Sequence, residues 1–147
     1  MSASTKLSSS VKAVCYLAES YPIPKTSKEI AENIGVNPSK LRQLLSMLIK
    51  NKIVSSTQGK TGGFMLAKDP RKIHLQEIYC SIEDRKAFHL DVTKRKEKKQ
   101  DRINEFNNYF LKLFADVQIE IEDMMRNISI KSIMDKLSIK SNYKENQ

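Results

Sequence analysis

The sequence predicts a mainly helical (α+β) fold with one small β-hairpin, followed by a long C-terminal helix. Apolar residues recur at helical spacing in the first 83 residues, two strand-like segments flank a glycine-rich turn, and a second helical pattern begins near residue 100. The 147 residues, 39% of them hydrophobic, suffice for one domain plus an extension. We predict a first domain over 1–83, a charged linker over 84–99, a long helix and a short terminal helix over 100–138, and a flexible tail over 139–147.

Two helices are predicted before residue 36. Residues 6–20 carry a helical stripe of apolar side chains, and the segment 21–24, which holds two prolines, ends that helix. Thr26 and Glu29 have the spacing of a capping box, in which each side chain bonds to the other residue's backbone amide. Gly35 stands where a left-handed C-cap belongs. A short helix is therefore expected between these two signals.

The following segment predicts the second half of a helix-turn-helix. Asn37 is a good N-cap residue and Pro38 suits the first helical position, so we expect a helix from there to about Lys50. One face of this helix is apolar: Leu41, Leu44, Leu45, Leu48 and Ile49. Two helices joined by a glycine-containing turn are typical of a helix-turn-helix, although many helical hairpins share the pattern.

A β-hairpin is predicted directly after these helices. Residues 53–57 and 64–68 read as short strands, and the turn between them holds three of the four glycines in the chain. A hairpin in this place makes the domain a winged helix-turn-helix. Its basic tip suits contact with a phosphate backbone or a minor groove.

His74 is expected to cap a fourth helix that runs to about Glu83. Residues 84–102 then hold eight basic and four acidic residues, which favours a solvated linker, with a second DNA-contacting element as the alternative. Ser129 is expected to cap a last helix over 130–137.

The long helix, from about Gln100 to Asn127, predicts a homodimer. Its apolar residues follow steps of three and four, as in a coiled coil: Ile103, Phe106, Phe110, Leu113, Val117, Ile121, Met124 and Ile128. About 27 residues of helix span about 40 Å, and a small domain offers little surface for such a length. Pairing with a second copy is therefore expected, and an intramolecular core helix is the alternative.

The charge distribution indicates a polyanionic partner. The chain has 26 Lys+Arg against 17 Asp+Glu, and residues 25–72 hold ten basic residues against three acidic ones. Such asymmetry is typical of nucleic-acid or anionic-membrane binding, and a merely soluble basic surface is the alternative. No apolar run is long enough to span a membrane and no secretory signal is evident, so a soluble cytoplasmic protein is expected.

The candidate DNA contacts lie at the start of each helix of the helix-turn-helix and in the wing. Arginine can bond to guanine with two hydrogen bonds, and glutamine to adenine. The candidates are Thr26, Ser27, Asn37, Ser39, Lys40, Arg42, Gln43, Gln58, Lys60 and Thr61. For each of them an ordinary solvated surface is the alternative.

Several segments in order resemble a known family of bacterial regulators: Ser27-Lys28-Glu29-Ile30-Ala31-Glu32, Gly35-Val36, Leu41-Arg42-Gln43-Leu44-Leu45, Ile53-Val54-Ser55-Ser56 and Gly59-Lys60-Thr61-Gly62-Gly63-Phe64. These segments are similar to the winged helix-turn-helix regulators that include the iron–sulfur cluster regulator, the nitric-oxide-sensing repressor and the cysteine-metabolism repressor. The resemblance covers about residues 6–137. It implies a homodimer with crossing long helices that binds a partly palindromic double-stranded DNA operator. We expect this regulator to act as a repressor, with activation as the alternative.

Two departures from that family are informative. Cluster-binding members carry three cysteines before the long helix, whereas this chain has only Cys15 and Cys80, so no iron–sulfur cluster, other cofactor or metal site is expected. The position of Arg42 is often glutamate in the family and that of Gln58 often arginine, so a different operator preference is expected.

The sequence does not predict an enzyme, because no nucleophile–base constellation, carboxylate pair or phosphate-cradling loop is present. Exposed aromatic platforms for RNA are also not evident. The sequence favours a DNA-binding regulator, and two alternatives stay open. One is a regulator with a thiol-based redox switch at Cys15 or Cys80, and the other is a winged helix that binds another protein.

Overall fold

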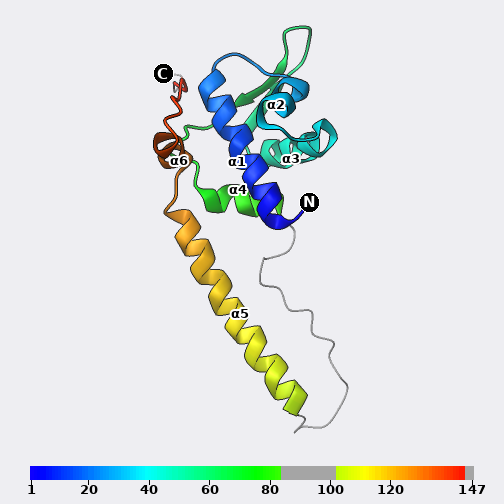
Figure 1. Cartoon of the computed structure of the whole chain (residues 1–147), viewed down its shortest axis with the longest axis vertical. Helices are drawn as coiled ribbons and strands as arrows, with labels where there is room; N and C mark the ends of the chain where they lie inside the picture. Colours follow the sequence, from blue (N-terminus) through cyan, green and yellow to red (C-terminus); the bar gives the residue numbers. More distant parts are fainter. Residues whose placement is uncertain (84–101, 145–147) are drawn as a thin grey trace.

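The computed structural model describes residues 1–83 and 102–144, and it confirms the predicted fold class. Six helices and one hairpin are described (Figure 1). The helices are α1 (Ala3–Ser20), α2 (Ser27–Ile34), α3 (Pro38–Lys50), α4 (Leu75–Ile82), α5 (Arg102–Arg126) and α6 (Ile130–Lys136), and the strands are β1 (Val54–Thr57) and β2 (Gly63–Leu66). The predicted linker over 84–99 lies outside the described residues.

The local signals for helix ends act as predicted. Thr26 Oγ1 accepts a hydrogen bond from the Glu29 amide at 3.1 Å, and Glu29 Oε2 accepts one from the Thr26 amide at 3.1 Å. Gly35 takes the left-handed conformation, with φ of 71°. The first helix begins three residues earlier than expected, because Ser2 accepts a hydrogen bond from the Thr5 amide.

The hairpin rests on a third piece of extended chain. Strands β1 and β2 pair antiparallel, with Val54 opposite Leu66, and Phe64 exchanges two backbone hydrogen bonds with Lys25 at 2.7 and 3.0 Å. A Cβ atom on Gly63 would lie 2.7 Å from the Lys25 carbonyl oxygen, so this close approach needs glycine. The wing is thereby joined to the segment between α1 and α2.

The start of α4 differs from the expectation for His74. This residue does precede the helix, but among the described residues its side chain makes no capping hydrogen bond. Its backbone instead forms a bridge to Ser129, flanked by bonds from the Leu75 amide to the Ile128 oxygen and from the Ile130 amide to the Ile73 oxygen, both 2.8 Å. Tertiary pairing therefore replaces the expected local cap.

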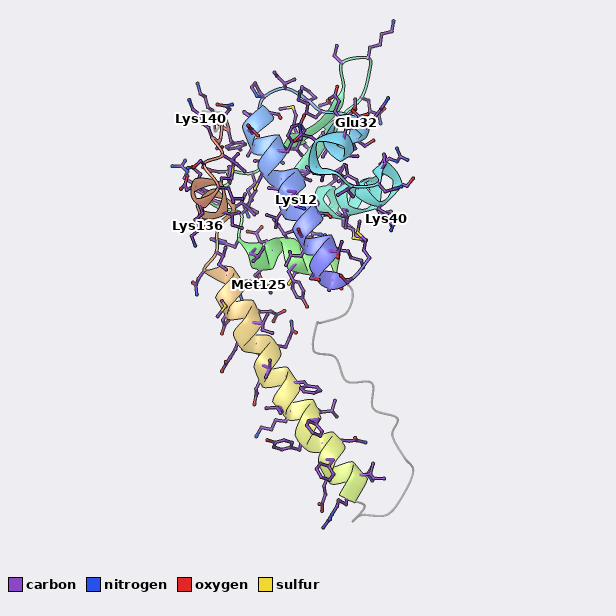
Figure 2. The ribbon with its side chains drawn as sticks, viewed as in Figure 1. Lys12, Glu32, Lys40, Met125, Lys136 and Lys140 are labelled. Carbon is purple, nitrogen blue, oxygen red and sulfur yellow. The ribbon has the colours of Figure 1, made fainter. Side chains whose placement is uncertain are left out.

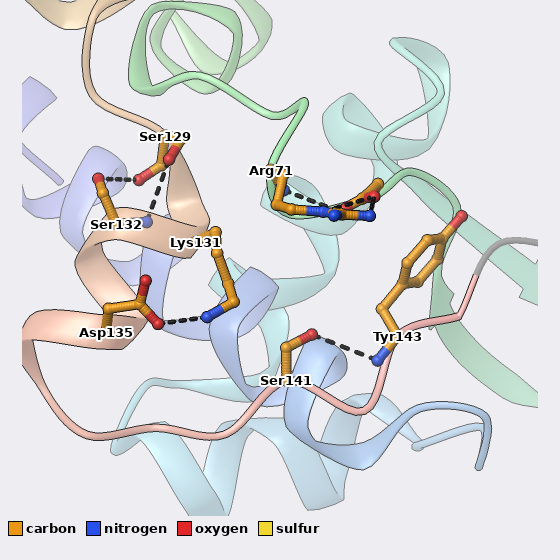
Figure 3. A network of polar contacts seen from close by, with 8 residues as sticks. Arg71, Ser129, Lys131, Ser132, Asp135, Ser141 and Tyr143 are labelled. Atoms are coloured by element: carbon orange, nitrogen blue, oxygen red, sulfur yellow. Dashed lines mark hydrogen bonds and ion pairs between the residues drawn. The ribbon is translucent and has the colours of Figure 1, made fainter.

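The last helix belongs to the core of the first domain. Ser129 Oγ accepts from the Ser132 amide at 3.1 Å, as expected of a cap (Figure 3). Ile130 and Met134 are fully buried in the same cluster as the apolar faces of α1, α3 and α4. The predicted unit over 100–138 therefore has two parts: α5 extends away from the domain, whereas α6 packs into its core.

The expectation of a flexible tail is wrong for residues 139–144. The Asn142 amide donates to the Ala18 oxygen at 2.9 Å, and its side-chain amide donates to the Glu19 oxygen at 2.7 Å. The ring of Tyr143 lies 4.7 Å from that of Tyr21. These contacts satisfy carbonyl groups that every helix C-terminus leaves without a partner inside the helix.

Helix α5 projects away from the domain (Figure 1). Of the predicted seam, Ile103, Phe106, Phe110, Leu113 and Met124 are exposed, and Val117 and Ile121 are half-buried. The Phe110 ring lies 6.3 Å from Phe106 and 5.7 Å from Phe114, so the exposed face is an aromatic ladder. This exposure does not support the alternative of an intramolecular core helix. None of the described helices meets the length and hydropathy of a membrane span.

Candidate nucleic-acid interface

The first turn of α3 is held by its own cap. Asn37 Oδ1 accepts hydrogen bonds from the amides of Ser39 at 2.9 Å and Lys40 at 3.3 Å, and Pro38 stands at the first position, where no amide is needed. The cap thereby uses the Asn37 side chain within the protein. The geometry gives Asn37 the role of orienting the helix start.

Four predicted contact residues share the outward face of α3. Ser39, Lys40, Arg42 and Gln43 are all exposed, whereas Leu41, Leu44, Leu45 and Leu48 on the opposite face are buried. Arg42 Nη2 donates to Ser39 Oγ at 3.3 Å, so these two side chains lie together on the surface. Figure 2 shows Lys40 on the side of the domain opposite to Lys136 and Lys140.

Two further residues, neither of them among the predicted contacts, lie on the same face. Ser46 and Lys50 are exposed, and Ser46 Oγ donates to the Arg42 carbonyl oxygen at 3.0 Å. Helical spacing is the signal for both, because Ser46 lies three residues after Gln43 and Lys50 lies four residues after Ser46. The outward face is therefore longer than predicted and ends on a lysine.

The edge of this face that borders α2 is hollowed. Lys28, Glu32 and Arg42 line the hollow with smaller residues: Ala31, Gly35, Val36 and Pro38. A carboxylate thus lies beside two cations at the helix-turn-helix elbow. Thr26, at the start of α2, is exposed but engaged in the capping box, and Ser27 is half-buried.

The wing presents the remaining predicted residues. Gln58, Lys60 and Thr61 are exposed in the turn between β1 and β2, which extends beyond the helices at the end of the domain away from α5 (Figure 1). Gly59 has φ of 107°, and a Cβ atom on Gly62 would lie 2.3 Å from the Thr57 oxygen. The two glycines therefore allow the tight tip that carries Lys60 outward.

The two cysteines lie in unlike surroundings. Cys15 is buried in the core on α1, and burial, followed by the nearby Glu19 carboxylate, raises the pKa of its thiol to about 11. Cys80 is exposed on α4, where Gln76 Nε2 donates to its Sγ at 3.1 Å. A cluster of three or more metal-ligating side chains is not found among residues 1–83 and 102–144.

The thiols are expected to differ strongly in reactivity. At pH 8 only about one Cys15 thiol in a thousand is ionised, and the thiolate is the nucleophile. A maleimide should therefore label one thiol per folded chain quickly and the second, Cys15, only slowly, at a rate that rises as the pH approaches about 11. The variant Cys80→Ser should abolish the fast phase. A fast phase that survives in Cys80→Ser would contradict the burial of Cys15.

Comparison with known proteins identifies relatives of the whole fold. A profile of the Rrf2 family, described as an iron-dependent transcriptional regulator, matches residues 3–136. The transcriptional regulator IscR of Escherichia coli K12 is 37% identical over 67 residues, which are 46% of this chain and 40% of that protein; IscR of Cronobacter sakazakii matches equally. The match thus spans less than half the length of these curated relatives.

Two solved structures extend the likeness to most of the chain. IscR of T. potens superposes with a TM-score of 0.67 at 25% identity, covering 93% of this chain and 88% of that one. CymR of B. subtilis, the global cysteine regulator, superposes with a TM-score of 0.66 at 19% identity, covering 92% and 96%. At that identity the second likeness concerns the fold alone.

Proposed function

The chain belongs to the Rrf2 family of transcriptional regulators, and we propose that it binds a partly palindromic DNA operator as a homodimer and represses transcription there. IscR is named as a transcriptional regulator and CymR as a global cysteine regulator, and neither is named as an enzyme. The observation that carries the proposal is the exposed polar face of α3, from Ser39 to Gln43, on a capped helix-turn-helix with a basic wing beside it.

Each part of the surface has a distinct task in this proposal. Side chains of α3 read base edges in the major groove, as recognition helices do. Lys60 at the wing tip contacts a phosphate or the minor groove, and phosphate contacts position the protein without reading sequence. The exposed seam of α5 pairs two copies, since two-fold symmetry matches a palindromic operator.

Selection from random DNA tests the proposal. We expect the intact chain to recover one motif with two inverted half-sites whose centres lie about 10 base pairs, or a multiple of this, apart. Recovery of no motif, together with the absence of salt-sensitive binding to DNA, would favour the protein-interaction alternative and overturn the proposal. Half-sites without a preferred spacing would argue against the dimer alone.

We further propose that this member carries no iron–sulfur cluster, despite the description of its family. The donors do not fit the group: the whole chain has two cysteines and two histidines, and Cys15 is in the core with a raised thiol pKa. Anaerobic reconstitution with iron and sulfide is therefore expected to leave no stoichiometric visible absorbance. A stable chromophore at one per subunit would show that other residues supply ligands.

A further inference from the structure

The long helix is attached to the DNA-binding domain at only a few places. Gln118 and Met125 are the buried residues of α5 as the structure describes it, and residues 102–117 have no buried side chain. At its C-terminal end, α5 leads into the backbone bonds that join Ile128 to Leu75 and Ile130 to Ile73. Figure 2 shows Met125 at this junction. Gln118 is therefore the last buried attachment before the helix projects.

Gln118 is unusual at such a place because it is polar. Its side chain is 1% exposed, and its Nε2 donates to the hydroxyl of Tyr79 on α4, itself 6% exposed, at 3.4 Å. A buried amide needs hydrogen bonds, and these require one relative position of the two helices, whereas apolar contacts allow several. Met125, two helical turns further along the same face, is the other buried residue of α5 and is apolar.

We propose that the Gln118–Tyr79 pair sets the angle between α5 and the DNA-binding domain and thereby selects the spacing between operator half-sites. This inference rests on the proposed function, since it requires a dimer that pairs through α5. The two residues are positioning residues, not DNA contacts.

Because the projecting part of α5 is long, a small tilt of this helix at Gln118 produces a large displacement at its far end. From Gln118 to Arg102 the helix spans about 24 Å. A tilt of about 10° at Gln118 moves the far end by about 4 Å, which exceeds the rise of about 3.4 Å per base pair. Because a two-fold dimer repeats the tilt in both subunits, a junction that allows such tilts after loss of the pair allows a range of separations between the recognition helices.

The test measures the binding of the intact chain to a series of operators. Each operator carries the two half-sites recovered by selection, with the spacing changed in single-base-pair steps. We expect the parent to prefer one spacing over its neighbours by about tenfold. Gln118→Met and Tyr79→Phe, which keep most of the buried volume, are each expected to reduce that preference to about threefold or less. The double variant should reduce the preference by less than the two single effects combined, because both single changes remove the hydrogen bond between Gln118 and Tyr79.

Met125→Leu is the matched control, since it alters the same face of α5 without a polar group. It is expected to keep the parental spacing preference, even if all spacings bind more weakly. Parental spacing preference in both Gln118→Met and Tyr79→Phe would overturn the inference, as would a parent that binds the operator without any spacing preference. A parent that recovers no operator would instead overturn the proposed function itself.

Discussion

Replacing Phe110 with aspartate is expected to yield a monomer that no longer binds its operator specifically, although α3 is unchanged. Phe110 lies at the centre of the exposed aromatic ladder of α5, with rings of Phe106, Tyr109 and Phe114 within 6.3 Å. In the proposed dimer the substitution would bury an unpaired carboxylate, which costs several kcal/mol. A single helix-turn-helix with one wing should then bind DNA only in the non-specific range, about 10⁻⁴–10⁻⁶ M.

Sedimentation velocity and a gel-shift titration measure the two halves of this prediction. Val117→Asp is a second seam variant with the same expected outcome, with insolubility as a further sign of an uncovered apolar face. Asn108→Asp is the matched control, because Asn108 is exposed on the opposite side of α5 and receives the same carboxylate. A folded Phe110→Asp monomer with parental operator affinity would refute the dimer model and the role of α5.

Arg42→Ala and Gln43→Ala are expected to relax the preference at particular base pairs. Each should cost about 1–3 kcal/mol on the selected operator and much less on random DNA, because a bidentate contact to a base is lost. Both side chains are exposed on α3, so their removal leaves the core intact. The measurement is a titration of each variant against operators that differ at one base pair.

Lys60→Ala is the contrasting variant. A wing lysine on a phosphate should weaken operator and random DNA nearly alike and reduce the slope of log affinity against log salt by about one. If the Arg42 and Gln43 variants behave in this uniform way too, α3 contributes only backbone contacts and does not read the sequence. Full parental affinity and selectivity in both α3 variants would remove α3 from the interface.

The parts of the fold that could be predicted depend on residues close in sequence. The capping box of Thr26 and Glu29, the left-handed Gly35 and the Asn37–Pro38 helix start each involve groups within four residues of one another. Two of the candidate side chains on α3, Arg42 and Ser39, are neighbours through helical spacing alone. The exposure of Ser46 and Lys50 on the same face follows from the same helical spacing.

The sequence by itself therefore determined the helix-turn-helix, the wing and the apolar seam, since hydrogen bonding within a turn and the period of a helix depend on local residues. The tertiary structure decided which surfaces these elements cover. The Asn142 side chain donates a hydrogen bond to Glu19 of α1, 123 residues earlier in the chain. His74 pairs with Ser129, and Gln118 is buried against Tyr79. Such contacts depend on how the whole apolar surface is buried, and no local pattern encodes them.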